Sequence, residues 1–164
     1  MVLCAHSDAG FHNESKGSIR AGAHIFLSEN DSMPQRNSPI LTLSQIIKLA
    51  MSSSLEEEFG AIFITAQEMV EMRQKLEEMK ISQPKYPIQT DNSAAAGVVN
   101  NTIVPRKLKT MERRLHCLIC REAQGQFCYY WASINLKWGD YSININPPSI
   151  TNRKEFNFRE ILIA

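Results

Sequence analysis

The chain has 164 residues, of which 43% are hydrophobic and 21% are charged, and 18 basic against 17 acidic side chains leave a formal net charge of +1. This apolar fraction is too high for a disordered chain, and the length suits one domain with its own core. The near-zero net charge excludes a global attraction to nucleic acids, and no apolar stretch approaches the roughly 18 residues that span a bilayer.

Three strands are expected in the first part of the chain. Residues 2–8 form a short apolar run that ends in a carboxylate, which is typical of a buried strand with Asp8 at its end. Residues 21–28 and residues 40–47 are rich in apolar side chains, and a polar loop with two prolines separates them. Connections this short favour an antiparallel meander.

A long amphipathic helix follows over residues 54–80, because apolar side chains recur there at spacings of three and four. Ser54, with Glu57 three residues later, predicts an N-cap and a capping box, and Pro84 limits the helix at its other end. The apolar positions are Leu55, Phe59, Ile62, Phe63, Ala66, Met69, Val70, Leu76 and Met79.

Strands and helices then alternate. Residues 86–91 form a short strand that again ends in an aspartate, Asp91, and an alanine-rich helix is expected over residues 92–100. A second amphipathic helix is expected over residues 107–124, and a final strand over residues 127–131. This order of elements predicts a mixed α/β domain. The strands that carry Asp8 and Asp91 should be adjacent and parallel at the centre of the sheet, because the β-α-β order between them permits a parallel neighbour.

Four carboxylates stand where a metal site could form. Asp8 and Asp91 each follow an apolar strand, Glu58 lies in the first turn of the long helix, and Asp140 follows a late loop. Carboxylates brought together repel one another unless cations neutralise them, and hard oxygen ligands favour Mg²⁺ or Mn²⁺. Two such ions about 4 Å apart can clamp the oxygens of a phosphodiester displacement. From spacing alone, the alternative stays open that these acids only end strands and favour a helix N-terminus.

Four short motifs carry these acids in order: residues 6–9 (His-Ser-Asp-Ala), 52–59 (Ser-Ser-Ser-Leu-Glu-Glu-Glu-Phe), 90–93 (Thr-Asp-Asn-Ser) and 139–141 (Gly-Asp-Tyr). The linking segments at residues 20–22, 76–79, 97–101 and 121–127 agree with the same pattern. From about residue 2 to residue 150, the chain resembles the ribonuclease H domain of copia-type LTR retrotransposon polyproteins. Each motif is unspecific alone, whereas the ordered set is specific.

The resemblance implies a ribonuclease H-like fold, with a mixed five-stranded sheet of three antiparallel strands plus parallel strands, flanked by helices. We expect this domain over residues 1–146 and an irregular tail over residues 147–164. The implied activity is two-metal hydrolysis of the RNA strand of an RNA–DNA hybrid, with Mg²⁺ or Mn²⁺ as cofactor. The implied partners are the hybrid and, in the parent polyprotein, a reverse transcriptase.

The resemblance places four acids at the catalytic and metal-ligand positions: Asp8, Glu58, Asp91 and Asp140. An acidic–aromatic–small–alanine sequence at residues 58–61 selects Glu58 among three neighbouring glutamates, and Glu56 points elsewhere on a helix. After Asp140 the chain departs from the family, because Ile-Asn-Ile-Asn at residues 143–146 replaces Thr-Lys-His-His. A catalytically inactive remnant that folds and at most binds nucleic acid is therefore the alternative function.

A cluster of basic residues lies at the start of the second amphipathic helix and contains one acidic residue. The basic residues are Arg106, Lys107, Lys109, Arg113 and Arg114. Such a patch can hold the phosphates of a nucleic acid, so we expect these residues to bind the hybrid. An ordinary solvated helix face is the alternative.

Four cysteines occur without a recognisable export signal, so we expect no disulfide framework and a cytoplasmic or nuclear protein that is not secreted. Cys117 and Cys120 have the spacing of a metal-binding pair, and His116 stands beside them. A zinc site needs a second pair of ligands at similar spacing, which the sequence lacks. We expect these thiols to be small apolar fillers in a helix.

Overall fold

The computed structural model describes residues 1–10, 19–31, 34–35, 37–48, 51, 53–103 and 112–132. Several predicted features lie outside these ranges: Asp140, Arg106, Lys107, Lys109 and the tail over residues 147–164. Among the described residues, no helix is both long enough and apolar enough to cross a membrane.

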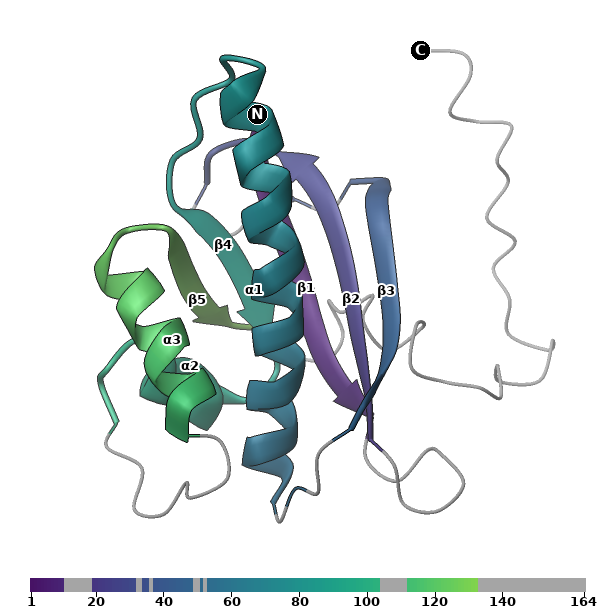
Figure 1. The fold of residues 1–164 in the computed structure, drawn as a ribbon, viewed down its shortest axis with the longest axis vertical. Helices are drawn as coiled ribbons and strands as arrows, with labels where there is room; N and C mark the ends of the chain where they lie inside the picture. Colours follow the sequence, from purple (N-terminus) through teal and green to yellow (C-terminus); the bar gives the residue numbers. More distant parts are fainter. Residues whose placement is uncertain are drawn as a thin grey trace, which may run out of the picture.

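The described strands form one sheet: β1 (Val2–Gly10), β2 (Ile19–Ser28), β3 (Pro39–Ile47), β4 (Tyr86–Thr90) and β5 (Phe127–Trp131). Their spatial order is β3-β2-β1-β4-β5 (Figure 1). The first three strands are antiparallel, β4 is parallel to β1, and β5 is parallel to β4. The predicted mixed sheet of five strands is confirmed, and each predicted strand matches within two residues at either end.

The described helices are α1 (Ser54–Glu78), α2 (Ser93–Val99) and α3 (Glu112–Ala123). The long helix α1 lies across one face of the sheet, and α3 lies beside it near β5 (Figure 1). The Thr65 hydroxyl donates to Ser7 Oγ at 3.1 Å and so fastens the middle of α1 to β1. All three predicted helices are found, and the part of the third before residue 112 lies outside the described residues.

The predicted start of α1 at residue 54 is confirmed, but its predicted N-cap is wrong by one residue. Ser53, not Ser54, is the N-cap, because its backbone is extended and its hydroxyl accepts from the Glu56 amide at 3.3 Å. Neighbouring serines offer the same side chain, so the sequence alone does not distinguish them. The α1 end is close to the prediction: Glu78 is the last helical residue, and Lys80 takes the left-handed conformation that stops the helix.

The main hydrophobic core lies where α1 packs on the sheet. From α1 it takes Phe59, Ile62 and Met69, all fully buried, and from the sheet it takes residues such as Leu3 and Ile25. Burying one such side chain stabilises the fold by about 1.5–3 kcal/mol. These helix positions are among those that the three- and four-residue spacing predicts, so the periodicity correctly identified the inner face of α1.

Tyr86 provides a test of burial at the start of β4. Its ring is fully buried, and its hydroxyl has no hydrogen-bond partner among the described residues. Burial raises the pKa of Tyr86 to about 12, against the opposing effect of the Arg73 guanidinium, which lies 4.9 Å from the ring centroid. Because the pKa is raised only in the folded state, the free energy of unfolding falls as pH rises from about 10 through 12.

We expect Tyr86→Phe to reduce this alkaline loss of stability and to leave stability at pH 7 unchanged or higher, because a buried hydroxyl without a partner is removed. Urea unfolding at a series of pH values between neutrality and pH 11 measures both effects. If the unfolding free energy of the two proteins depended equally on pH above 10, the alkaline loss of stability would not come from the raised pKa of Tyr86.

Candidate metal centre

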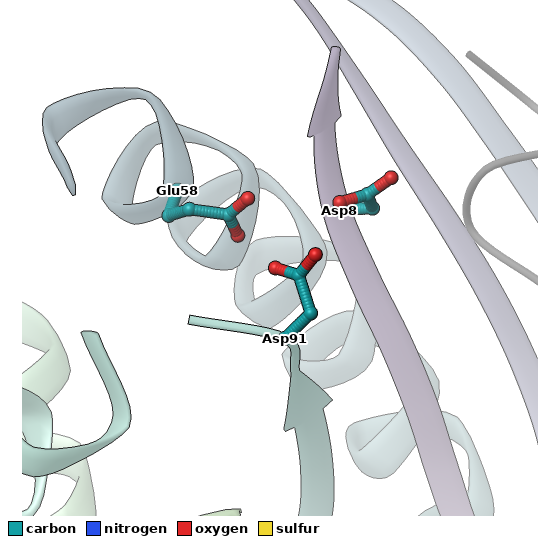
Figure 2. A group of neighbouring side chains, drawn as sticks. All are labelled: Asp8, Glu58 and Asp91. Carbon is teal, nitrogen blue, oxygen red and sulfur yellow. The ribbon is translucent and has the colours of Figure 1, made fainter. Parts of the chain in front are cut away.

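Three carboxylates from three different elements converge at one end of the sheet (Figure 2). Asp8 belongs to β1, Glu58 to the first turns of α1, and Asp91 directly follows β4. One carboxylate oxygen from each lies within 4.8 Å of the others. Asp8 and Glu58 are buried, with 4% and 5% of their surface exposed, while Asp91 is half-buried. The site is therefore open to solvent mainly at Asp91.

The parallel pairing of β1 with β4 brings the two aspartates together. His6 and Gln89 are the last recorded pair, and continuing that register by two residues sets Asp8 level with Asp91. The prediction that these strands are adjacent and parallel near the centre of the sheet is confirmed. Asp8 does not end its strand, however, because β1 continues to Gly10 and pairs Asp8 with Gly22 of β2. The aspartates meet where the pairing of β1 with β4 stops.

The start of α1 supplies the third carboxylate. Glu56, Glu57 and Glu58 are all buried, and of these only Glu58 joins the two aspartates among the described residues. Successive helical residues are rotated by about 100°, so neighbouring glutamates cannot all face one point. The partial positive charge of a helix N-terminus favours carboxylates in this turn. The sequence pattern did not predict that Glu56 and Glu57 are buried.

Thr90 connects two of the elements that carry the carboxylates. Its fully buried hydroxyl donates to Glu58 Oε2 at 3.2 Å and accepts from the Asn92 amide at 3.2 Å. Asn92 in turn caps α2 by accepting from the Ala95 amide at 3.0 Å. The turn that carries Asp91 is thus tied to Glu58. This role of Thr90 was not predicted from the sequence, in which the available signal was a hydroxyl residue directly before the aspartate at a buried strand end.

Trp131, at the end of β5, is a second neighbour that the sequence analysis did not place in the site. Its indole Nε1 donates to the backbone oxygen of Asp91 at 2.9 Å. The ring is 51% exposed, so it borders the site without closing it. Together with Thr90, it holds the segment after β4 in place.

The carboxylates fit a hard divalent cation. Oxygen ligands on opposite sides of one Mg²⁺ lie about 4.2 Å apart, so small side-chain rotations bring the three oxygens, now within 4.8 Å, onto a shared ion. The all-oxygen donor set suits Mg²⁺ or Mn²⁺ rather than zinc. In the part of the chain that the structure describes, no other group of three histidine, cysteine or acidic side chains comes this close. The Cys120 Sγ lies 3.0 Å from His116 Nδ1, but among the described residues no third potential metal ligand completes a group with this pair.

We expect Thr90→Val to weaken metal binding by about tenfold, whereas Thr90→Ser keeps it, because removal of a group that orients a metal ligand costs 10- to 100-fold. Titration of Mn²⁺ by calorimetry measures the affinity, and urea unfolding in EDTA measures the stability of each variant. A valine variant that loses stability but binds Mn²⁺ as tightly as the wild type would show that Thr90 has only a structural role.

The basic residues are only partly described. Arg113 is exposed on α3, and the Arg114 guanidinium lies over the Phe63 ring of α1, 5.2 Å from its centroid. The remaining members of the predicted cluster are Arg106, Lys107 and Lys109, outside the described residues.

Comparison with known proteins identifies the fold. Neither a protein-family model nor a curated protein matches the chain. Among solved structures, LC11-RNase H1, isolated from compost by a metagenomic approach, is 13% identical with a TM-score of 0.64, and the match covers 87% of this chain and 93% of that chain. The chain has the ribonuclease H fold. The N-terminal RNase H domain of rv2228c from Mycobacterium tuberculosis, also 13% identical, matches 87% of this chain and 90% of its own with a TM-score of 0.60.

The same ribonuclease H fold occurs in a viral protein. In the prototype foamy virus protease–reverse transcriptase, the match is 15% identical, has a TM-score of 0.50, and covers 90% of this chain but 21% of the viral chain. At such identities the likeness shows the ribonuclease H fold alone. A further structure of LC11-RNase H1, 12% identical with a TM-score of 0.63, is a complex with an RNA/DNA hybrid.

Proposed function

We propose that this chain is a metal-dependent nuclease that hydrolyses the RNA strand of an RNA–DNA hybrid. The observation that carries the proposal is the meeting of Asp8, Glu58 and Asp91, within 4.8 Å, on a ribonuclease H fold. The hybrid bound in the LC11-RNase H1 complex supports the choice of substrate. Asp140 is proposed as the fourth ligand, as the resemblance to copia-type domains implies.

Each carboxylate of the candidate metal centre has its own role in the proposed reaction. Mg²⁺ or Mn²⁺, if bound by these residues, would polarise a water nucleophile and would neutralise charge on the leaving oxygen. Asp8 would hold metal from the rigid centre of the sheet, and Asp91 from the turn that Trp131 anchors. Glu58 would hold metal from α1, with its Oε2 oriented by the Thr90 hydroxyl. Because Asp8 and Glu58 are buried, water competes weakly with their contacts to a cation.

Substrate contacts beyond the metal site are proposed for the basic cluster. Arg113 is exposed on α3 and is available to a phosphate, and we propose the same role for Arg106, Lys107, Lys109 and Arg114. The 2′-hydroxyl of the RNA strand distinguishes the hybrid from a DNA duplex.

We further propose that the domain derives from a copia-type polyprotein, in which a reverse transcriptase is its partner, and that it acts in the cytoplasm or the nucleus. The foamy virus match supports the polyprotein context, because the similar region there is 21% of a protease–reverse transcriptase chain. An inactive remnant is the second candidate, favoured by the departure from the family pattern at residues 143–146.

The full chain, purified and supplied with Mn²⁺, is tested on a hybrid whose RNA strand carries an end label. We expect cleavage of the RNA strand, no cleavage in EDTA, and no cleavage of a DNA duplex of the same sequence. Folded protein that binds the hybrid but leaves it intact in both Mg²⁺ and Mn²⁺ would contradict the nuclease proposal and favour the inactive remnant.

A further inference from the structure

Strand β3 forms one edge of the sheet, and among the described residues no strand pairs with its outer side. Its nine residues carry no charge, and Ile40 and Ile46 are 51% and 41% exposed. The open N–H and C=O groups of such an edge are a template for another strand, and proteins usually shield them with charges, prolines or bulges. Here the one proline, Pro39, stands at the first position, and the irregularity in the pairing with β2 falls next to it, at Ile40.

We propose that β3 pairs antiparallel with β3 of a second copy of this chain, giving a twofold dimer with a continuous sheet. The sequence of β3 is self-complementary around Leu43. If Leu43 stands opposite its own copy, Ile40 faces Ile46 of the second copy, and Thr42 faces Ser44. Each exposed isoleucine thereby gains a β-branched partner, and Thr42 comes to lie beside Ser44, whose hydroxyl already accepts from Arg20 of β2 at 3.0 Å.

The side chains that meet lie on one face of the sheet. Positions 40, 42, 44 and 46 alternate with the inward positions of β3, and all four are exposed. Cross-strand pairs of β-branched residues stabilise antiparallel sheets, whereas like charges placed opposite each other destabilise them. In this register Lys48, the first charged residue after β3, stands opposite Ser38 rather than another lysine. In the same register Pro39, which has no backbone N–H, stands opposite Ile47, so the residues around Leu43 provide most of the backbone pairing. An uncharged strand gives a charged peptide no ionic contact.

The proposed pairing is closed. A twofold axis uses the β3 edge of both copies, so assembly stops at two chains. The metal centre lies on β1, on α1 and after β4, and β2 separates β1 from the pairing edge. The dimer therefore goes beyond the proposed function and does not depend on it, and the cleavage rate per chain is expected to be the same in monomer and dimer.

Sedimentation of the full chain over about a hundredfold range of concentration tests the proposal. We expect the mass to rise from 18.6 kDa to twice that value. Ile46→Lys should weaken association by about tenfold or more, because it places an ammonium group opposite Ile40. Ile81→Lys is the matched control, since Ile81 is 42% exposed but lies between α1 and β4. Circular dichroism verifies that both variants fold.

Paired substitutions test the register. Ile40→Lys combined with Ile46→Glu places opposite charges together across the twofold axis and should restore the dimer, whereas Ile40→Lys combined with Ile46→Lys should abolish it. The proposal is overturned by a wild-type chain that stays monomeric throughout, by a dimer that persists in the double lysine variant, or by assemblies that grow beyond two chains. Failure of the lysine–glutamate pair to associate would overturn the register around Leu43.

Discussion

We expect Asp91→Asn to slow the proposed metal-dependent cleavage of an RNA–DNA hybrid by at least about a hundredfold, and Asp8→Asn to do the same. This is the largest effect that we expect. Each change replaces a charged ligand by a neutral amide at the point where the two carboxylates meet Glu58. Loss of one preorganised electrostatic contact typically slows catalysis by about a hundredfold to a thousandfold, and both aspartates are held by the central strands. Initial rates on labelled hybrid in Mn²⁺ measure the loss.

Matched controls separate this effect from a general loss of charge. Asp31→Asn changes an exposed aspartate in the loop after β2 and should leave the rate unchanged. Glu58→Gln should lower the rate, while Glu71→Gln, about 20 Å further along the same helix, should not. Cleavage by Asp91→Asn at the wild-type rate would remove these carboxylates from the mechanism.

The second large effect is stabilisation of the fold by metal. Carboxylates held within 4.8 Å repel one another, so binding of Mg²⁺ or Mn²⁺ relieves that repulsion in the folded state alone. At a metal concentration of 100 times the dissociation constant, the expected gain in unfolding free energy is about 2.7 kcal/mol. Asp91→Asn should be more stable than the wild type in EDTA and should lose most of the response to metal. Thermal unfolding with and without millimolar metal measures both.

The control for this experiment is ionic strength. Sodium chloride at matched ionic strength should not reproduce the shift in Tm, and Asp31→Asn should keep the full response. A wild-type Tm that is indifferent to millimolar Mg²⁺ and Mn²⁺ would argue against a metal centre, whatever the outcome of the cleavage assay.

The sequence predicted those parts of the fold that depend on local patterns. The apolar run of β1 and the three- and four-residue spacing of α1 follow from which side chains face the core, so both elements were predicted with small errors at their ends. The adjacent parallel pairing of β1 and β4 also followed, because a helical crossover between strands normally returns them in parallel. Ser53 was missed as the N-cap because its neighbour has the same side chain.

The details of the candidate site were less accessible from the sequence. Spacing left Glu56, Glu57 and Glu58 equivalent, and only the resemblance to a family favoured Glu58. Thr90 was missed because its contact with Glu58 joins residues far apart in the chain and depends on how α1 packs against β4. Periodicity predicts which face of an element is buried, but it does not predict which polar atoms meet across two packed elements.

The indole of Trp131 has a practical consequence. A tryptophan whose N–H is held by the carbonyl of Asp91, and whose ring is half-exposed, emits light that responds to changes in local polarity and charge. The chain has only two tryptophans, so Trp138→Phe leaves this one as the sole long-wavelength emitter. Its fluorescence then reports directly on events beside the carboxylates, and metal or nucleic acid can be titrated on the chain without any attached label.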